Sequence, residues 1–181
     1  AWDNGVFDNT TFNPTSTITY SVIGTDANGC ENTDQVEVIV NSLPIINAGS
    51  DATLCLGDSI QLNATGTALL TWDVGTLNGN YFTPPVGTTI AIVAGTDLNG
   101  CMNIDTIIII VNPVPSVNAG ANQAYCENDS IILQATGNGT MTWDNGVQDN
   151  VPFYQVPGSQ VYHVQTVDAN GCMNTDSVTV L

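Results

Sequence analysis

Residues 26–40 read DANGCENTDQVEVIV, and closely similar runs return as DLNGCMNIDTIIIIV at 97–111 and DANGCMNTDSVTVL at 168–181. Each run has an Asn-Gly pair at its third and fourth positions, which supplies the positive φ that a tight hairpin needs. A segment that alternates polar and apolar residues follows, and it predicts a strand with one buried and one exposed face. We therefore expect antiparallel sheets that pack face to face.

These runs belong to a repeat of 71 residues, and the cysteines recur with that spacing: Cys30, Cys101 and Cys172, and also Cys55 and Cys126. Because the period exceeds the roughly 20 to 45 residues of a solenoid turn, each unit is expected to close its own core. The predicted units are the C-terminal half of an immunoglobulin-like repeat at 1–42 and complete repeats at 43–112 and 113–181.

The first unit is incomplete, and two explanations stay open. Either the sequence is a window of a longer array, or strands from a neighbouring molecule complete the half-unit. The linkers at 41–44 and 112–115 contain proline, which fixes φ and removes a hydrogen-bond donor. We expect these linkers to be short and stiff, with the repeats strung end to end as a rod.

The expected fold class is all-β, built of tandem immunoglobulin-like antiparallel β-sandwich domains. Several side chains are expected to point into the cores: Val36, Val38, Val40, Ile107, Ile109, Val111, Trp72, Trp143, Tyr20, Tyr162 and Ala91. Ile108 and Ile110 fall on the outer face. They mark either a lateral contact that would join chains into filaments or an outer face that is merely half covered.

The cysteines are expected to pair within each complete repeat, as Cys55–Cys101 and Cys126–Cys172, both 46 residues apart. Cys30 would then bond to a partner upstream of Ala1. A loop of that size is worth about 4 kcal/mol in the chain-entropy model. Disulfides at this density predict a location outside the cytoplasm.

Composition limits the partners. The chain has no Lys or Arg and seventeen Asp and Glu, for a formal charge of −17. Such a field repels phosphate backbones and anionic lipids, so neither nucleic acid nor membrane insertion is expected. The charge either attracts divalent cations or keeps a long exposed fibre soluble, and both readings stay open.

Catalysis is not expected. His163 is the single histidine and alternates outward, and the chain offers no lysine or arginine for acid/base work or charge stabilisation. No cofactor is predicted apart from Ca²⁺, for which Asp51 and Asp97 are the candidate ligands. The alternative for the repeated aspartates is that they cap turns through backbone hydrogen bonds.

The combination of Asn-Ala-Gly, Cys-x-x-Asp-Ser, Leu-x-Ala-Thr-Gly, Trp-Asp-x-Gly and Asp-Ala-Asn-Gly-Cys resembles the PKD-like and immunoglobulin-like repeats of giant Bacteroidetes surface adhesins. After Trp-Asp this chain departs from the usual Gly-Asp-Gly of PKD repeats. The resemblance implies type IX secretion, an extracellular or bacterial cell-surface location, and a role in adhesion, gliding or surface filaments.

Four Asp-Ser/Thr-aliphatic runs resemble the O-glycosylation signal of exported Bacteroidetes proteins. Their hydroxyl residues are Ser59, Thr106, Ser130 and Ser177. The alternative is ordinary strand-start chemistry, in which an Asp turn precedes a β-branched run.

Two functions follow from these observations. The first is a structural stalk or filament segment whose disulfide-clamped repeats act as rigid spacers, with neighbouring repeats as the main partners. The second is a carbohydrate-binding array in which three tryptophans serve as stacking platforms for glycans: Trp2, Trp72 and Trp143. Solvent exposure of the tryptophans separates the two hypotheses.

Overall fold

The computed structural model describes residues 1–66 and 69–181, and all regular elements in this part of the chain are β-strands. The prediction of an all-β fold of immunoglobulin-like sandwiches is confirmed by the strand pairing given below. No helix in the described part is long and apolar enough to cross a membrane. The chain divides into two compact units: Ala1–Ala48 with Asn63–Asn78 and Ile92–Thr106, and Gly49–Leu62 with Gly79–Ala91 and Ile107–Leu181.

The first unit begins with a hairpin. Strands β1 (Ile18–Thr25) and β2 (Glu31–Val38) pair antiparallel along their full length. The Asn-Gly turn between them follows the sequence prediction, with Gly29 at φ 82°. The unit also contains the short antiparallel pair of β3 (Ile46–Asn47) with β6 (Thr65–Gly66).

The middle of the chain supplies a four-stranded sheet in the order β4-β10-β9-β7. Its strands are β4 (Ala52–Cys55), β7 (Leu69–Trp72), β9 (Gly87–Thr96) and β10 (Met102–Asn112). β4 runs parallel to the end of β10, whereas β7 pairs antiparallel with β9. A separate ladder joins β5 (Ile60–Gln61) to β8 (Tyr81–Phe82).

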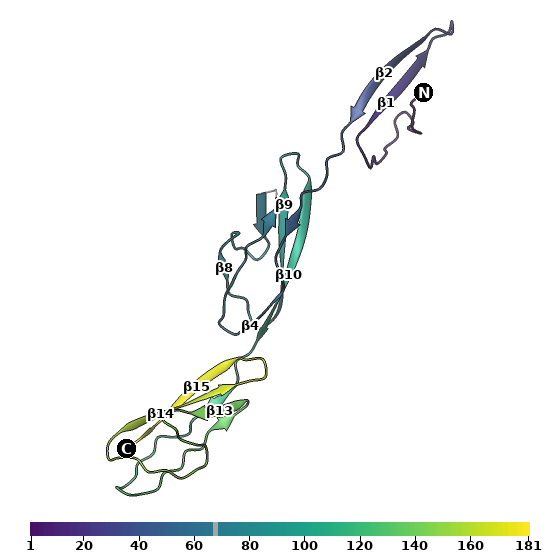
Figure 1. The fold of residues 1–181 in the computed structure, drawn as a ribbon. Helices are drawn as coiled ribbons and strands as arrows, with labels where there is room; N and C mark the ends of the chain where they lie inside the picture. Colours follow the sequence, from purple (N-terminus) through teal and green to yellow (C-terminus); the bar gives the residue numbers. More distant parts are fainter. Residues whose placement is uncertain (67–68) are drawn as a thin grey trace. The chain divides into compact units, whose positions relative to one another are not determined.

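The C-terminal part of the second unit repeats this arrangement. β13 (Thr140–Trp143), β14 (Gln160–Val167) and β15 (Met173–Val180) form one sheet, with β14 in the middle (Figure 1). A parallel bridge between Gln123 and Val180 takes the place of the β4–β10 ladder. β11 (Val117–Asn118) pairs with β12 (Thr136–Gly137), and Ile131 bridges Phe153.

One core fills the space inside this C-terminal sandwich. The side chains that form it are Ala119, Ile131, Leu133, Ala135, Trp143, Tyr162, Val164, Val178 and Val180. Those on β14 and β15 alternate with exposed or half-buried neighbours, as the period-two pattern predicts. Burial of this apolar surface is the main favourable term in the stability of the repeat.

The two internal tryptophans are core residues, as predicted. Trp72 is 6% exposed and Trp143 is 8% exposed. The Trp72 indole N–H donates to the Asn78 side-chain oxygen at 3.1 Å, and the Trp143 indole N–H donates to the Asp149 carboxylate at 2.9 Å. Each indole is therefore both buried and hydrogen-bonded, as a buried Trp requires.

The predicted inner face of the first hairpin is only partly covered, which corrects the expectation for Val36. This side chain is 46% exposed, whereas its repeat equivalents Ile107 and Val178 are 4% and 0% exposed. β1 and β2 form a two-stranded sheet, and an isolated antiparallel bridge joins Trp2 to Val22 on β1. Tyr20 is buried, and its ring meets Phe12 edge to face with centroids 5.1 Å apart.

Other side-chain predictions are confirmed. The buried set includes Ile109, Val111, Tyr162 and Ala91. Ile108 and Ile110 are exposed on the outer face of β10, as the alternation predicts.

The core of the C-terminal repeat yields a first prediction. Replacing the fully buried Leu133 (Leu133→Ala) should lower the free energy of unfolding by about 2–5 kcal/mol, because lost transfer energy adds to the cost of a cavity. The neighbouring exposed residue is the control, and Ile132→Ala should change it by only about 0.5 kcal/mol. Hydrogen exchange of β14 and β15 under increasing urea measures both, and equal effects would contradict the assigned core.

Candidate functional site: a disulfide junction

The first half of the junction stands at the end of β4. Cys55 lies opposite Asn112 in the parallel ladder, and the Leu56 N–H donates to the Asn112 carbonyl at 2.8 Å. A tight turn follows, in which the Asp58 carboxylate accepts the Cys55 N–H at 3.0 Å and the Asp58 N–H donates to the Cys55 carbonyl. The Cys-x-x-Asp spacing thus lets Asp58 hydrogen-bond both the N–H and the carbonyl of Cys55, which fixes the backbone that carries the cysteine side chain.

The second half is the turn between β14 and β15. The Asp168 carboxylate accepts the N–H groups of Asn170 at 2.8 Å and Cys172 at 2.9 Å. The Asp168 N–H in turn donates to the Cys172 carbonyl at 3.0 Å. Gly171 has φ 82°, a left-handed conformation that glycine adopts without strain. The Asp-x-Asn-Gly-Cys sequence therefore encodes the turn and places the cysteine at its end.

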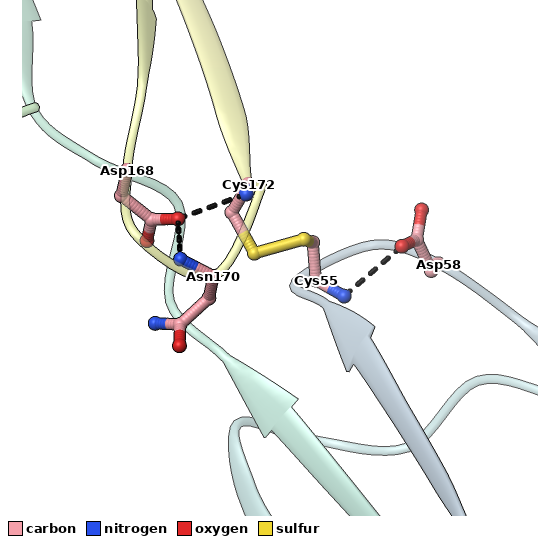
Figure 2. Close-up of a disulfide and its surroundings, with 5 residues drawn as sticks. All are labelled: Cys55, Asp58, Asp168, Asn170 and Cys172. Carbon is pink, nitrogen blue, oxygen red and sulfur yellow. Dashed lines mark hydrogen bonds between the residues drawn. A yellow bond between two sulfur atoms is a disulfide. The ribbon is translucent and has the colours of Figure 1, made fainter. Parts of the chain in front are cut away.

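A disulfide joins the two halves. Cys55 and Cys172 are bonded, with Cα atoms 5.5 Å apart and a sequence separation of 117 (Figure 2). The bond connects the predicted repeat at 43–112 to the predicted repeat at 113–181. Cys30, Cys101 and Cys126 are free.

The predicted Cys55–Cys101 pairing is therefore wrong, and strand direction explains why. Because β4 is parallel to β10, Cys55 lies beside Asn112 at the end of β10. Cys101 lies just before Met102, where β10 begins. Eleven residues of strand separate these two points, about 36 Å at about 3.3 Å per residue. Cysteine Cα atoms must approach within about 7 Å to bond.

The predicted Cys126–Cys172 pairing fails for the same reason. The Tyr125 N–H donates to the Leu181 carbonyl at 3.0 Å, so Cys126 stands at the far end of β15. Cys172 precedes the first residue of that strand, about 26 Å away along it. The two cysteines of a repeat thus occupy opposite ends of the sheet that carries them.

The linker beside the disulfide is pinned at both ends. The Asn112 carbonyl accepts the Leu56 N–H, and the Pro115 carbonyl accepts the Asn174 side-chain N–H at 2.9 Å. Pro115 is fully buried. Two covalent connections, the backbone at 112–115 and the cystine, therefore run between the same two repeats.

The aspartates that open the last strands clamp the preceding chain. The Asp105 carboxylate accepts the Ala48 N–H, and the Asp176 carboxylate accepts the Ala119 N–H, each at 2.8 Å. These backbone hydrogen bonds hold the pKa of both carboxyl groups below the ordinary aspartate value. The Cys30 and Asn28 N–H groups lower the pKa of Asp26 in the same way.

The calcium candidates are used in backbone contacts of this kind. The Asp51 carboxylate accepts the Ile108 N–H at 2.8 Å, and the Asp97 carboxylate accepts the N–H groups of Asn99 and Cys101 at 2.9 Å. No cluster of three or more His, Cys, Asp or Glu side chains arranged to hold a metal ion occurs in residues 1–66 and 69–181. The geometry thus supports the alternative of turn-capping carboxylates.

The remaining candidate residues lie on the surface. All four glycosylation candidates are exposed: Ser59, Thr106, Ser130 and Ser177. His163 is also exposed on β14, and its backbone N–H donates to the Asp144 carboxylate at 3.0 Å. Glycosylation therefore stays a prediction that the accessibility of these hydroxyls permits.

No protein-family model and no curated protein matches the chain. Partial similarity extends to solved cadherin structures. The protocadherin gamma B7 extracellular domains 1–4 give 13% identity over 92% of this chain and 57% of that chain, with a TM-score of 0.31. Mouse cadherin-23 EC22-24 gives 16% identity, 91% and 74% coverage, and a TM-score of 0.29.

Drosophila N-cadherin EC1-4 gives 12% identity over 93% of this chain and 59% of that chain, with a TM-score of 0.27. The chain spans a little more than half the length of the protocadherin gamma B7 structure. Superpositions this loose carry no argument, so the fold assignment rests on the strand pairing itself.

Removing the disulfide should destabilise and uncouple the two joined repeats. The chain-entropy model gives about 5 kcal/mol for a closed loop of 117 residues, which is the expected loss in the Cys55→Ser/Cys172→Ser variant. The matched control is Cys101→Ser/Cys126→Ser, which removes two free thiols and should change stability by about 0.5 kcal/mol or less. Calorimetry measures both, and a larger loss in the control would refute the assigned bond.

The Asp176 clamp should make stability depend on pH. Its folded pKa is lowered, so the carboxylate stabilises the fold above its unfolded pKa, and this contribution disappears as pH falls through the folded pKa. Asp176→Asn keeps an acceptor oxygen but does not titrate. The stability difference between the parent chain and this variant should therefore shrink from about pH 5 to about pH 2, as followed by urea denaturation. A difference that stays constant over that range would show that the clamp is not electrostatic.

Proposed function

We propose that the chain is a structural stalk or filament segment of a secreted, bacterial cell-surface adhesin, in which the repeats act as stiff spacers. The observation that carries the proposal is the Cys55–Cys172 bond beside the proline linker. A single flexible linker lets neighbouring domains rotate, whereas two covalent connections between the same pair restrict bending. Length and stiffness are the properties that such a joint controls.

The strand arrangement suits a chain under tension. β4 and the end of β10 are parallel and hydrogen-bonded over Ala52–Cys55 and Ile109–Asn112. A pull toward the N-terminus on β4 and toward the C-terminus on β10 shears these bonds together instead of opening them one at a time. This shear resistance acts in the reduced chain, because in the oxidised chain the disulfide carries the load from Cys55 to Cys172 and bypasses the residues between them, including β10.

The surface chemistry agrees with an exposed extracellular fibre. A charge of −17 without any Lys or Arg makes copies of the chain repel one another, which favours solubility. Oxidised cysteines belong to compartments outside the cytoplasm. We include type IX export and glycosylation at the exposed Ser59 and Ser130 in the proposal, on the sequence resemblance alone.

The carbohydrate-binding alternative loses its main support. Stacking platforms must present an aromatic face to solvent, but Trp72 and Trp143 are buried with their indole N–H groups occupied inside the repeats. Trp2 is only partly buried, and its indole N–H donates to Asp8 at 2.8 Å. No row of exposed tryptophans is therefore present for a glycan.

Single-molecule stretching from the two termini tests the spacer role. In the oxidised chain the loop closed by the disulfide, with a sequence separation of 117, should not contribute to the extended length. Reduction should therefore lengthen the fully extended molecule by about 400 Å, at about 3.5 Å per residue. The Cys101→Ser/Cys126→Ser chain should show the same gain. Equal extension before and after reduction, or easy bending of the oxidised repeats, would exclude a clamped spacer.

A further inference from the structure

Cysteine sites of the two kinds that form the disulfide junction, the Cys-x-x-Asp turn and the Asp-x-Asn-Gly-Cys turn, also occur where the cysteine is free. The Cys126 N–H donates to the Asp129 carboxylate at 3.0 Å and the Asp129 N–H donates to the Cys126 carbonyl at 3.0 Å. These are the contacts that Asp58 makes with Cys55 in the bonded junction. Cys126 is exposed and free.

The opposite half is also present in unbonded copies. The Asp97 carboxylate accepts the Asn99 and Cys101 N–H groups, each at 2.9 Å, and the Asp97 N–H donates to the Cys101 carbonyl. Asp26 holds Cys30 in the same turn. Both turns reproduce the geometry of the bonded turn at Asp168.

No repeat can join its own two halves, because the sheet places them at opposite ends. The segment before Cys126 nevertheless runs parallel to the last strand of its repeat, as β4 before Cys55 runs parallel to β10. The Leu181 N–H donates to the Gln123 carbonyl and the Leu181 carbonyl accepts the Tyr125 N–H, so the last strand runs parallel to 123–125. β10 runs beside β4 in the same way before the linker that leads to the partner turn.

We propose that Cys126 is the attachment site for a further repeat of this kind placed after Leu181, through the cysteine of its Asp-x-Asn-Gly-Cys turn. The bonded pair is separated by 117 residues, the sum of the repeat period and the 46 residues between the cysteines of one repeat. The same rule assigns Cys101 and Cys30 to Cys-x-x-Asp halves of preceding repeats. The inference rests on the proposed spacer function, since a disulfide between each pair of neighbouring repeats would continue the stiff spacer along the chain.

The bond forms by thiol–disulfide exchange with a disulfide oxidant, such as oxidised glutathione or an oxidoreductase. The Cys126 thiolate attacks the oxidant to give a mixed disulfide and release one thiol. The thiolate of the incoming turn then attacks the Cys126 sulfur and displaces the second thiol. Two protein thiols lose two protons and two electrons, and the oxidant gains both.

A chain lengthened by one repeat tests the assignment. Residues 40–110 are added again after Leu181, in register with the period, with Cys55→Ser in the added copy and Cys30→Ser and Cys101→Ser in the parent part. The chain is oxidised with a glutathione buffer, the remaining thiols are alkylated, and the protein is cut before aspartate. Trypsin is unsuitable because the sequence has no Lys or Arg.

We expect the peptide 105–128, which carries Cys126, to be joined to 97–104 of the added copy within one molecule. Peptide 51–57 should remain joined to 168–175, as in the parent chain. In the matched Cys126→Ser chain the added 97–104 peptide should be alkylated, with the 51–57 to 168–175 bond unchanged.

Three results overturn the inference: a free Cys126, a Cys126–Cys172 bond, or Cys126 bonded only between separate molecules. Loss of the 51–57 to 168–175 bond instead removes the clamp on which the proposed function depends, so the two failures are distinguishable. A second chain covers poor folding of the added copy. It adds residues 111–181 after Leu181, with Cys126→Ser and Ala169→Leu in the added copy. The Ala169→Leu change shifts the mass of the added turn peptide, so that it is distinguished from the parent peptide 168–175. A free Cys126 in the parent part of this second chain also overturns the inference.

Discussion

The parallel pairing of β4 with the end of β10 is the constraint on which the rest of the structure depends. It carries Cys55 to the end of the sheet that is far from the β9–β10 turn, and the Gln123–Val180 bridge does the same for Cys126. A repeat built in this way cannot close its own cystine. Its cysteines become connectors, and the Cys55–Cys172 bond is such a connection.

Local features were predictable because their cause lies in adjacent residues. The Asn-Gly turns, the alternating last strands and the buried Trp72 and Trp143 each follow from short-range sequence patterns. The cystine was mispredicted because a spacing of 46 residues does not reveal strand direction. The exposure of Val36 depends on how far other segments cover the hairpin, and local sequence patterns do not predict that either.

The acidic side chains work mainly as backbone clamps. Asp105 and Asp176 fasten the start of a repeat to its last strand, whereas Asp97 and Asp168 shape the turns that present cysteine. Each carboxylate satisfies N–H groups that strand pairing leaves open. The strong negative charge of the chain is thus partly structural, and calcium is not required to explain these positions.

The disulfide map of the oxidised 181-residue chain tests the central claim most directly. Cleavage before aspartate places every cysteine on a separate peptide, so mass spectrometry can assign each bond. The account predicts that 51–57 is joined to 168–175, and that 26–33, 97–104 and 105–128 carry free thiols. A bond between 51–57 and 97–104 would contradict the parallel strand arrangement and the joint built on it.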